Sequence, residues 1–219
     1  MCGRYALYGP RKRLRTDREY FDALDAVAPR YNVAPTNVMP IVVLKDGAPV
    51  VIQARWGLVP PHAKDMKSGA AKINAPCEKI SAWSDYRAPY RAKRRCLVPA
   101  SGFYEWEARP DGKQPYYFFS PEGEWLVFAG LWEQWRQPEG ELLTTYSIIT
   151  TAPNDFVRRF HDRMPVVLEE KDYDEWLTTD DPRAVLKACH NEALTNFPVS
   201  RRVNSVKNDD PSLVEPIEL

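Results

Sequence analysis

Short runs of β-branched and aromatic residues, separated by prolines, constrain this chain more than any other feature. Runs of this kind are typical of strands. The chain has twenty prolines and ten glycines, which predicts irregular connections between the strands instead of long helices. We therefore expect an α+β fold with a curved, barrel-like and mainly antiparallel sheet, in preference to a doubly wound one. The expected strands are 41–44, 50–56, 96–98, 116–119, 125–129 and 146–150.

Helices are expected to flank the sheet. Apolar residues at helical spacing predict one over 16–27, and Pro153 is suited to the first turn of another that ends at Phe160. Two more are expected over 170–177 and 181–188. The 219 residues contain no repeat, linker or low-complexity segment, so we expect one domain over 1–219.

Composition narrows the class of protein. An apolar content of 44% excludes a disordered chain, and no apolar run approaches the length of a membrane span. With no secretory signal visible, a soluble cytoplasmic protein is expected. The net charge of zero conceals an asymmetry: residues 1–100 hold 18 Lys and Arg against 8 Asp and Glu, and the remainder 12 against 22. The first half could present a basic face to a polyanion, or the halves could pair with each other.

Four cysteines stand at positions 2, 77, 96 and 189, without the close pairs typical of zinc sites, so no metal is expected. Cys2 differs from the others through its position. Removal of Met1 would leave an α-amine and a thiol on one residue, a pair that closes a thiazolidine ring on an aldehyde. The amine titrates near pH 8 and is partly neutral under physiological conditions. Alternatively, an N-terminal nucleophile attacks an amide, or Cys2 is merely the second residue.

Three further residues are candidates for chemistry. Asn74 lies between small and apolar neighbours, where an asparagine is also a common turn former. If 102–106 is a strand, Glu105 shares a face with Phe103, and a carboxylate among aromatics suits acid-base work unless it is exposed. His161 lies in Phe-His-Asp-Arg-Met-Pro, where it is either a proton-transfer group or a loop residue.

Two loop-rich segments, 31–36 and 55–60, combine flat apolar groups with cations. Such surfaces stack nucleobases and pair with phosphates, although they are more often core edges and turns.

Read in order, six segments resemble the SOS response-associated peptidase (SRAP) family over nearly the whole chain. Any one of them is weak evidence, but six in order are specific. They are Met1-Cys2-Gly3-Arg4, Tyr31-Asn32-Val33-Ala34-Pro35, Arg55-Trp56-Gly57-Leu58-Val59-Pro60, Ile73-Asn74-Ala75, Gly102-Phe103-Tyr104-Glu105-Trp106 and His161-Asp162-Arg163-Met164-Pro165.

The resemblance implies a single SRAP-type domain that binds single-stranded DNA and caps abasic sites covalently, without a cofactor, through a thiazolidine at Cys2. It also implies autopeptidase activity that removes Met1, and lyase activity at the abasic site. By similarity, Asn74 positions Cys2 and the opened sugar, Glu105 is the acid-base group at the imine, and His161 assists sugar ring opening. The residues expected to contact DNA are Arg4, Asn32, Pro35, Trp56, Lys72 and Arg163.

The sequence departs from the family pattern in two places. Pro76 stands where the family commonly has an arginine that contacts phosphate, and Pro61-His62-Ala63 stands where it favours aromatic residues. If Met1 were retained, the α-amine of Cys2 would be locked in an amide and the ring could not form. A cysteine peptidase and a noncovalent single-strand-binding module remain alternative functions. We expect a monomer, cytoplasmic and associated with the nucleoid when bound to DNA.

Overall fold

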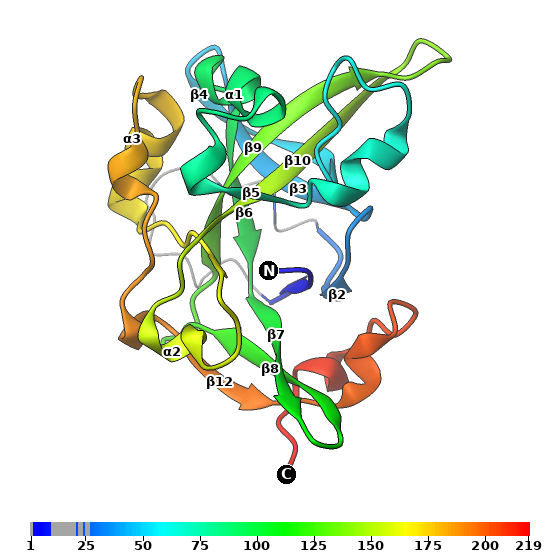
Figure 1. The fold of residues 1–219 in the computed structure, drawn as a ribbon, viewed down its shortest axis with the longest axis vertical. Coiled ribbons are helices and arrows are strands. Elements are labelled where there is room, and N and C mark those ends of the chain that lie inside the picture. The colour runs from blue at the N-terminus through cyan, green and yellow to red at the C-terminus, as the bar shows by residue number, and fades with distance from the viewer. Residues whose placement is uncertain (1, 10–20, 22–23, 25–26) are drawn as a thin grey trace.

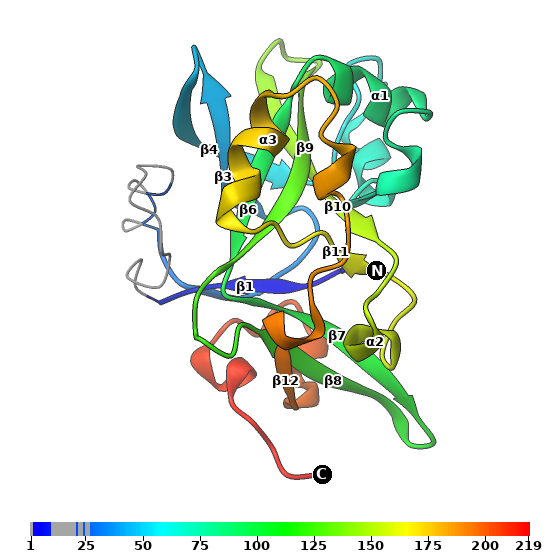
Figure 2. The ribbon, with the colours of Figure 1, turned by 90° about the vertical axis from the view of Figure 1, so that its left-hand side faces the viewer.

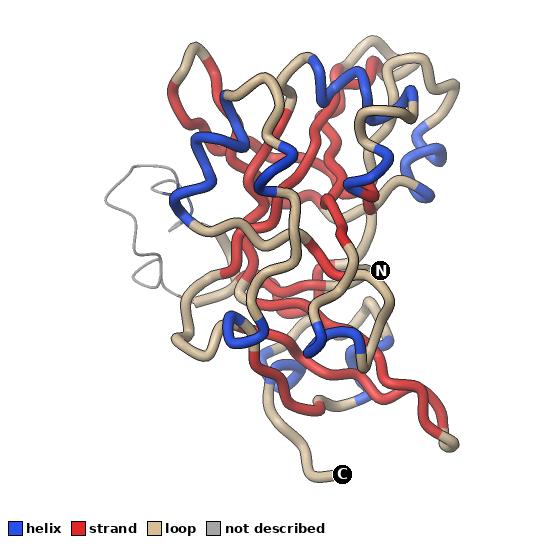
Figure 3. The backbone as a smooth tube through the Cα atoms, turned by 60° about the vertical axis from the view of Figure 1, so that its left-hand side comes forward, coloured by secondary structure: helices blue, strands red, loops and turns tan. Residues whose placement is uncertain are grey.

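The structure is a computed structural model that describes residues 2–9, 21, 24 and 27–219. Most of the helix predicted over 16–27 lies outside the described residues. Strands dominate the described chain and helices lie around them (Figures 1 and 3). The strands are β1 (Tyr5–Leu7), β2 (Arg30–Val33), β3 (Val38–Lys45), β4 (Ala48–Trp56), β5 (Asn74–Pro76), β6 (Arg95–Ala100), β7 (Gly102–Arg109), β8 (Gly112–Phe119), β9 (Leu126–Arg136), β10 (Leu142–Thr151), β11 (Met164–Pro165) and β12 (Thr195–Pro198).

One sheet closes into a barrel. Its order is β10-β4-β3-β6-β9, and β9 pairs back onto β10, so these five strands leave no open edge between them. All its pairings are antiparallel except that of β10 with β4, and β5 adds a second parallel pairing to β10. The predicted α+β class and the curved, barrel-like, mainly antiparallel sheet are therefore confirmed.

A second sheet, of order β12-β8-β7-β1-β2, lies below the barrel, and its strand β1 lies on the side nearest the barrel (Figure 2). The side chain of Tyr5 joins β1 to the barrel. Its hydroxyl is hydrogen-bonded to that of Tyr146 at 2.7 Å, and its ring lies 5.2 Å from the ring of Trp56 and 6.3 Å from that of Phe128. Burial of these rings holds β1 against the core of the barrel.

Strand β7 has a different hydrophobic cluster on each face. Phe103 packs with Phe118 and Phe128 on the barrel side, whereas Tyr104 packs with Tyr117 and Val203 against the C-terminal part of the chain. Because alternate residues of a strand share a face, Glu105 belongs to the face of Phe103. The expected strand and its alternation are both confirmed.

The helices are short: α1 (Ser84–Arg91), α2 (Asp155–Arg158) and α3 (Tyr173–Thr178). The side chain of Asn154 accepts the N–H of Val157 and caps α2, within the helix predicted from Pro153. The helix predicted over 181–188 is wrong, because only a 3₁₀ turn forms at Arg183–Val185. Helix α1 was not predicted, since it carries Pro89 in its interior.

Candidate active site

Cys2 lies just before β1 and is fully buried. Its thiol is 4.0 Å from the carbonyl oxygen of Arg4, and that carbonyl accepts the N–H of Tyr104 from β7. Burial raises the pKa of the thiol well above its usual range, and the charge of the nearby Glu105 raises it further. The thiol is therefore protonated at neutral pH and needs a base before it can react as a thiolate.

Asn74 holds the backbone of Cys2. Strand β5 pairs with the C-terminal end of β10, and Asn74 is buried there. The Nδ2 of Asn74 donates to the carbonyl oxygen of Cys2 at 2.9 Å. The hydroxyl of Tyr86 in turn donates to the Asn74 carbonyl at 3.0 Å. Within the described residues, the buried Oδ1 of Asn74 has no hydrogen-bond partner. An unsatisfied acceptor beside the second residue of the chain is a place for a donor.

Glu105 is the buried carboxylate of this site. Its side chain is 2% exposed, and burial raises the pKa of its carboxyl to about 7. Both protonation states are therefore populated near neutral pH, as an acid-base group requires. The carboxyl reaches a cavity of about 360 Å³ that is also lined by Trp106, Lys113, His161 and Asn204.

His161 follows α2 and lines the same cavity. Its Nδ1 lies 3.0 Å from the backbone N–H of Arg163 and 2.7 Å from the carboxylate of Asp162. The Asp162 side chain is 87% exposed, whereas the backbone N–H is fixed in place. Burial lowers the pKa of the imidazole, so the neutral ring with Nδ1 as acceptor is favoured and the proton is on Nε2.

The four predicted reactive residues thus come together from four separate parts of the chain. Asn74 is hydrogen-bonded to Cys2, the charge of Glu105 acts on the Cys2 thiol, and His161 shares the cavity of Glu105. This arrangement combines a thiol, a positioning amide, a carboxyl whose pKa is raised to about 7 and an imidazole whose pKa is lowered.

Two residues expected to contact DNA are instead inside the protein. Trp56 is fully buried, and its indole N–H donates to the carbonyl oxygen of Ile73 at 2.9 Å. Asn32 is 1% exposed, and its Nδ2 donates to the carbonyls of Val203, Ser205 and Asn208. In this structure Trp56 supports the site from within the core, and Asn32 fixes the C-terminal loop.

The other expected DNA contacts lie nearer the surface. Arg4 is half-buried, and its Nη1 donates to Asn32 Oδ1 at 2.7 Å and to the Val203 carbonyl at 2.6 Å. The Lys72 ammonium donates to the Ser68 carbonyl at 3.1 Å and lies 3.4 Å from Asp85. Pro35 is partly exposed in the turn after β2.

Arg163 is held by a carboxylate. Its guanidinium donates to both oxygens of Glu78, at 2.8 and 2.9 Å, and to the carbonyl oxygen of Thr150 at 2.7 Å. These hydrogen bonds lower the pKa of Glu78 to about 2. Glu78 lies two residues after Pro76, which already replaces a family arginine, so this corner of the site is less basic than the family pattern implies.

We therefore expect Glu78→Gln to increase affinity for single-stranded DNA about two- to fivefold at low salt. The change removes a negative charge and releases the Arg163 guanidinium for a phosphate. Fluorescence anisotropy across a salt series should also show the slope of log affinity against log salt steepening by about one. Glu139→Gln, the same change in the β9–β10 turn, is the control. Equal or weaker binding by Glu78→Gln would contradict this role.

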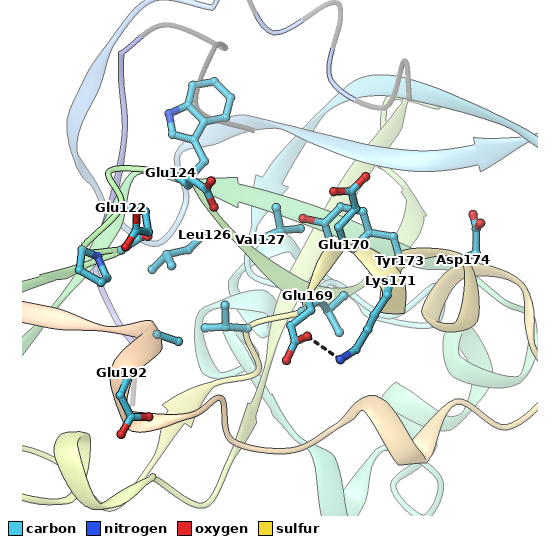
Figure 4. Close-up of a pocket in the computed structure, with 16 residues that line it drawn as sticks. Glu122, Glu124, Leu126, Val127, Glu169, Glu170, Lys171, Tyr173, Asp174 and Glu192 are labelled. Atoms are coloured by element: carbon cyan, nitrogen blue, oxygen red, sulfur yellow. Dashed lines mark ion pairs between the residues drawn. The ribbon is translucent and has the colours of Figure 1, made fainter. Parts of the chain in front are cut away.

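A second, larger cavity, of about 780 Å³, is lined by other residues and does not suit DNA (Figure 4). Six carboxylates line it, and Lys171, the basic residue among its lining, pairs with Glu169 at 2.6 Å. A phosphate backbone would be repelled there. The carboxylates belong to Glu122, Glu124, Glu169, Glu170, Asp174 and Glu192.

Sequence reasoning missed three residues at the site: Glu78, Lys113 and Asn204. None lies in a reactive motif, and only pairing across the fold brings them to the cavity or to Arg163. A signal was available for Lys113, because a short turn after a strand over 102–106 would return the next strand beside that one.

No helix among the described residues is both long and apolar enough to cross a membrane. No group of three or more His, Cys, Asp or Glu side chains within the described part of the chain is placed to hold a metal ion.

Comparisons with known proteins agree on one family. A model of the SOS response associated peptidase (SRAP) family matches residues 1–206. The chain is 38% identical over 224 residues to the abasic site processing protein YoqW of Bacillus subtilis (strain 168), with 98% of this chain and 99% of that protein covered. It is 32% identical over 266 residues to the abasic site processing protein HMCES of Gallus gallus, with 100% of this chain and 79% of that protein covered.

A crystal structure of a protein from Bacteroides thetaiotaomicron shares the fold, with a TM-score of 0.78 at 24% identity over 92% of each chain. The order of the motifs, the family match over most of the chain and the full-length relatives lead to one conclusion. The chain belongs to the SOS response associated peptidase (SRAP) family.

Proposed function

We propose that this protein processes abasic sites in single-stranded DNA by forming a covalent adduct through Cys2. The observation that carries the proposal is the arrangement around that residue: its backbone is held by Asn74, and Glu105, with a pKa of about 7, lies close to its thiol. The names of the relatives YoqW and HMCES, both abasic site processing proteins, support the choice of substrate.

The reaction begins with release of the α-amine. Hydrolysis of the Met1–Cys2 peptide bond consumes one water and leaves free methionine and a new N-terminus at Cys2. The resulting amine hydrogens would satisfy the Oδ1 of Asn74, which lacks a partner among the described residues. Asn74 would then orient both the carbonyl and the amine of Cys2.

The sugar must open before the amine can attack. An abasic deoxyribose is mostly a closed hemiacetal, in which the aldehyde carbon is masked by the ring oxygen. His161, with its proton on Nε2, donates that proton to the ring oxygen as the C–O bond breaks, while a base removes the hemiacetal proton. This step leaves a free hydroxyl and an aldehyde.

Ring closure then uses both groups of Cys2. The amine adds to the aldehyde carbon, and the carbinolamine loses water to give an imine after proton transfer from Glu105. The thiol then gives its proton to the Glu105 carboxylate, its sulfur adds to the carbon of the protonated imine, and the ring nitrogen becomes a neutral amine. The product is a five-membered thiazolidine, and closure from amine and aldehyde releases one water. Because burial keeps the thiol protonated, this step requires Glu105 as a base.

The proposal also includes two activities at the same site: self-processing of the Met1–Cys2 bond, and lyase activity through elimination of the 3′-phosphate from the imine. Contacts from Arg4, Lys72 and Arg163 to the DNA backbone, with Pro35 at a bend of the strand, complete the binding surface. Phosphate contacts of this kind position the strand without reading its sequence.

The test is an incubation of purified protein with single-stranded DNA that carries one abasic site, followed by intact mass measurement. We expect protein without Met1 and an adduct equal to protein plus DNA minus one water. Strands with an intact base, or with the aldehyde reduced to an alcohol, are the controls and should give no adduct. Processed, folded protein without an adduct would overturn the covalent function, and DNA-independent peptide turnover would favour a peptidase.

A further inference from the structure

The cavity of Glu105 and His161 has a second side that the proposed chemistry does not use. Lys113 on β8 and Asn204 in the C-terminal loop line this side, together with Trp106 of β7. In the β7–β8 hairpin, Lys113 lies opposite Ala108 and therefore on the same face as Trp106. Elements far apart in the chain thus bring an ammonium and an amide to the cavity beside the acid-base pair.

The orientation of Asn204 follows from its contact with Trp106. The indole N–H of Trp106 lies 2.8 Å from the side-chain amide of Asn204. Because an indole nitrogen only donates, the Asn204 atom that it meets must be the oxygen. The oxygen is thereby occupied, and what Asn204 can offer to a ligand is its NH₂ group. This makes Asn204 a donor for an anion.

Lys113 differs from the other cations near the hairpin. Arg109 pairs with Glu107 at 2.7 Å, and Arg201 pairs with Asp111 at 2.5 Å. The described residues provide no ion pair for Lys113, which is exposed. Its charge nevertheless acts on the site. It opposes the rise that burial causes in the pKa of Glu105, and it adds to the lowering that burial causes in the pKa of His161. The ammonium is therefore near the reacting groups and available to a ligand.

We propose that Lys113 and Asn204 form a subsite for one phosphodiester group of the bound strand, next to the abasic nucleotide. The inference rests on the proposed function and adds a specific contact to it. A phosphodiester carries one negative charge on two acceptor oxygens, which an ammonium and an amide NH₂ can both reach. Holding this phosphate positions the strand backbone at the cavity, so that the sugar next to it lies at Glu105 and His161.

The experiment measures the coupling between Lys113 and individual phosphates. Abasic strands are prepared in which one phosphate at a time, from two on the 5′ side to two on the 3′ side, is replaced by an uncharged methylphosphonate. Binding is measured in the Cys2→Ala background, with and without Lys113→Gln, and adduct formation is measured with Cys2 present. Lys45→Gln, the same change at the exposed end of β3, is the matched control.

With a normal strand, Lys113→Gln should weaken binding about two- to fivefold and reduce the salt slope by about one. One of the methylphosphonate strands should lack the charge that Lys113 binds. With that strand, Lys113→Gln should cause no further loss of affinity, whereas the effect of Lys45→Gln on affinity should be the same with every strand. Lys113→Gln should also shift the pH profile of adduct formation upward, since losing the ammonium raises the pKa of Glu105. A purely structural role would not produce either result.

The subsite would be overturned if the losses of affinity from Lys113→Gln and from the methylphosphonate were additive at every position, or if Lys113→Gln caused no loss. Either result would leave the adduct chemistry intact. A wild-type protein that forms no adduct would overturn the proposed function, and coupling in the binding measurements would still decide the role of Lys113. Competition by inorganic phosphate as strong as that by the strand would show that the pair binds free phosphate instead.

Discussion

Cys2→Ala is expected to abolish the adduct that survives denaturation. Once Met1 has been removed, alanine at this position carries the α-amine but lacks the thiol. The reaction can then proceed only as far as an imine, which hydrolyses when the protein unfolds. The loss should be complete on a denaturing gel and by intact mass. Borohydride, which reduces an imine to a stable amine, should still trap a Cys2→Ala adduct. Trapping would show that the α-amine forms the imine and that the thiol is needed only to close the ring.

Two controls accompany this variant. Cys189→Ala removes a partly buried thiol far from the site in sequence and should leave the adduct unchanged. Noncovalent binding of an abasic strand by Cys2→Ala should remain within about twofold of the wild type, because an exchange at one buried atom removes no phosphate contact. A denaturation-resistant adduct of Cys2→Ala without reductant would refute the thiazolidine.

Glu105→Gln should have the second-largest effect. Glutamine fills nearly the same space but cannot transfer a proton, so adduct formation near pH 7 should slow by about 10²–10⁴-fold. Because the pKa of Glu105 is about 7, the wild-type rate should change across neutral pH, and the residual rate of the variant should lose that dependence. Rates should be measured from pH 5 to 9 under single-turnover conditions. An unchanged rate and profile would remove Glu105 from the mechanism.

The same substitution should stabilise the fold at high pH. The carboxyl pKa rises from 4.5 in the unfolded chain to about 7 in the folded one, so the folded state binds the proton more tightly. The protonated Glu105 carboxyl therefore makes its full contribution to the free energy of unfolding of the wild type below about pH 4.5. That contribution is lost as the pH rises through 7. At pH 8 Glu105→Gln should exceed the wild type in free energy of unfolding by up to about 3 kcal/mol.

Denaturant unfolding at pH 4 and pH 8 checks this prediction, since the difference should vanish at the lower pH. Glu107→Gln is the matched control on the same strand. The pKa of Glu107 is lowered by its hydrogen bond to Arg109, so its replacement should give no gain at pH 8. A Glu105→Gln variant less stable than the wild type at pH 8 would mean that the buried carboxylate is stabilised by the fold instead of strained by it.

Much of the fold could be predicted from local patterns. All six expected strands form, because β-branched and aromatic side chains pack well on the partly buried surface of a sheet. The alternation in β7 placed Glu105 on the face of Phe103, since the period of a strand is two. The reactivity that we propose for Cys2 likewise rests on its position in the chain, through covalent chemistry of an amine and a thiol on one residue.

The tertiary structure decided which of these residues are accessible and what each one meets. Trp56 and Asn32 lie in motifs that suggest contact with DNA, yet barrel closure buries the first and the C-terminal loop engages the second. Arg163 meets Glu78 from 85 residues away, and Asn74 meets Cys2 from 72. A local pattern specifies the conformation of a segment, whereas burial, pKa and ion pairing depend on contacts between segments that only the folded chain brings together.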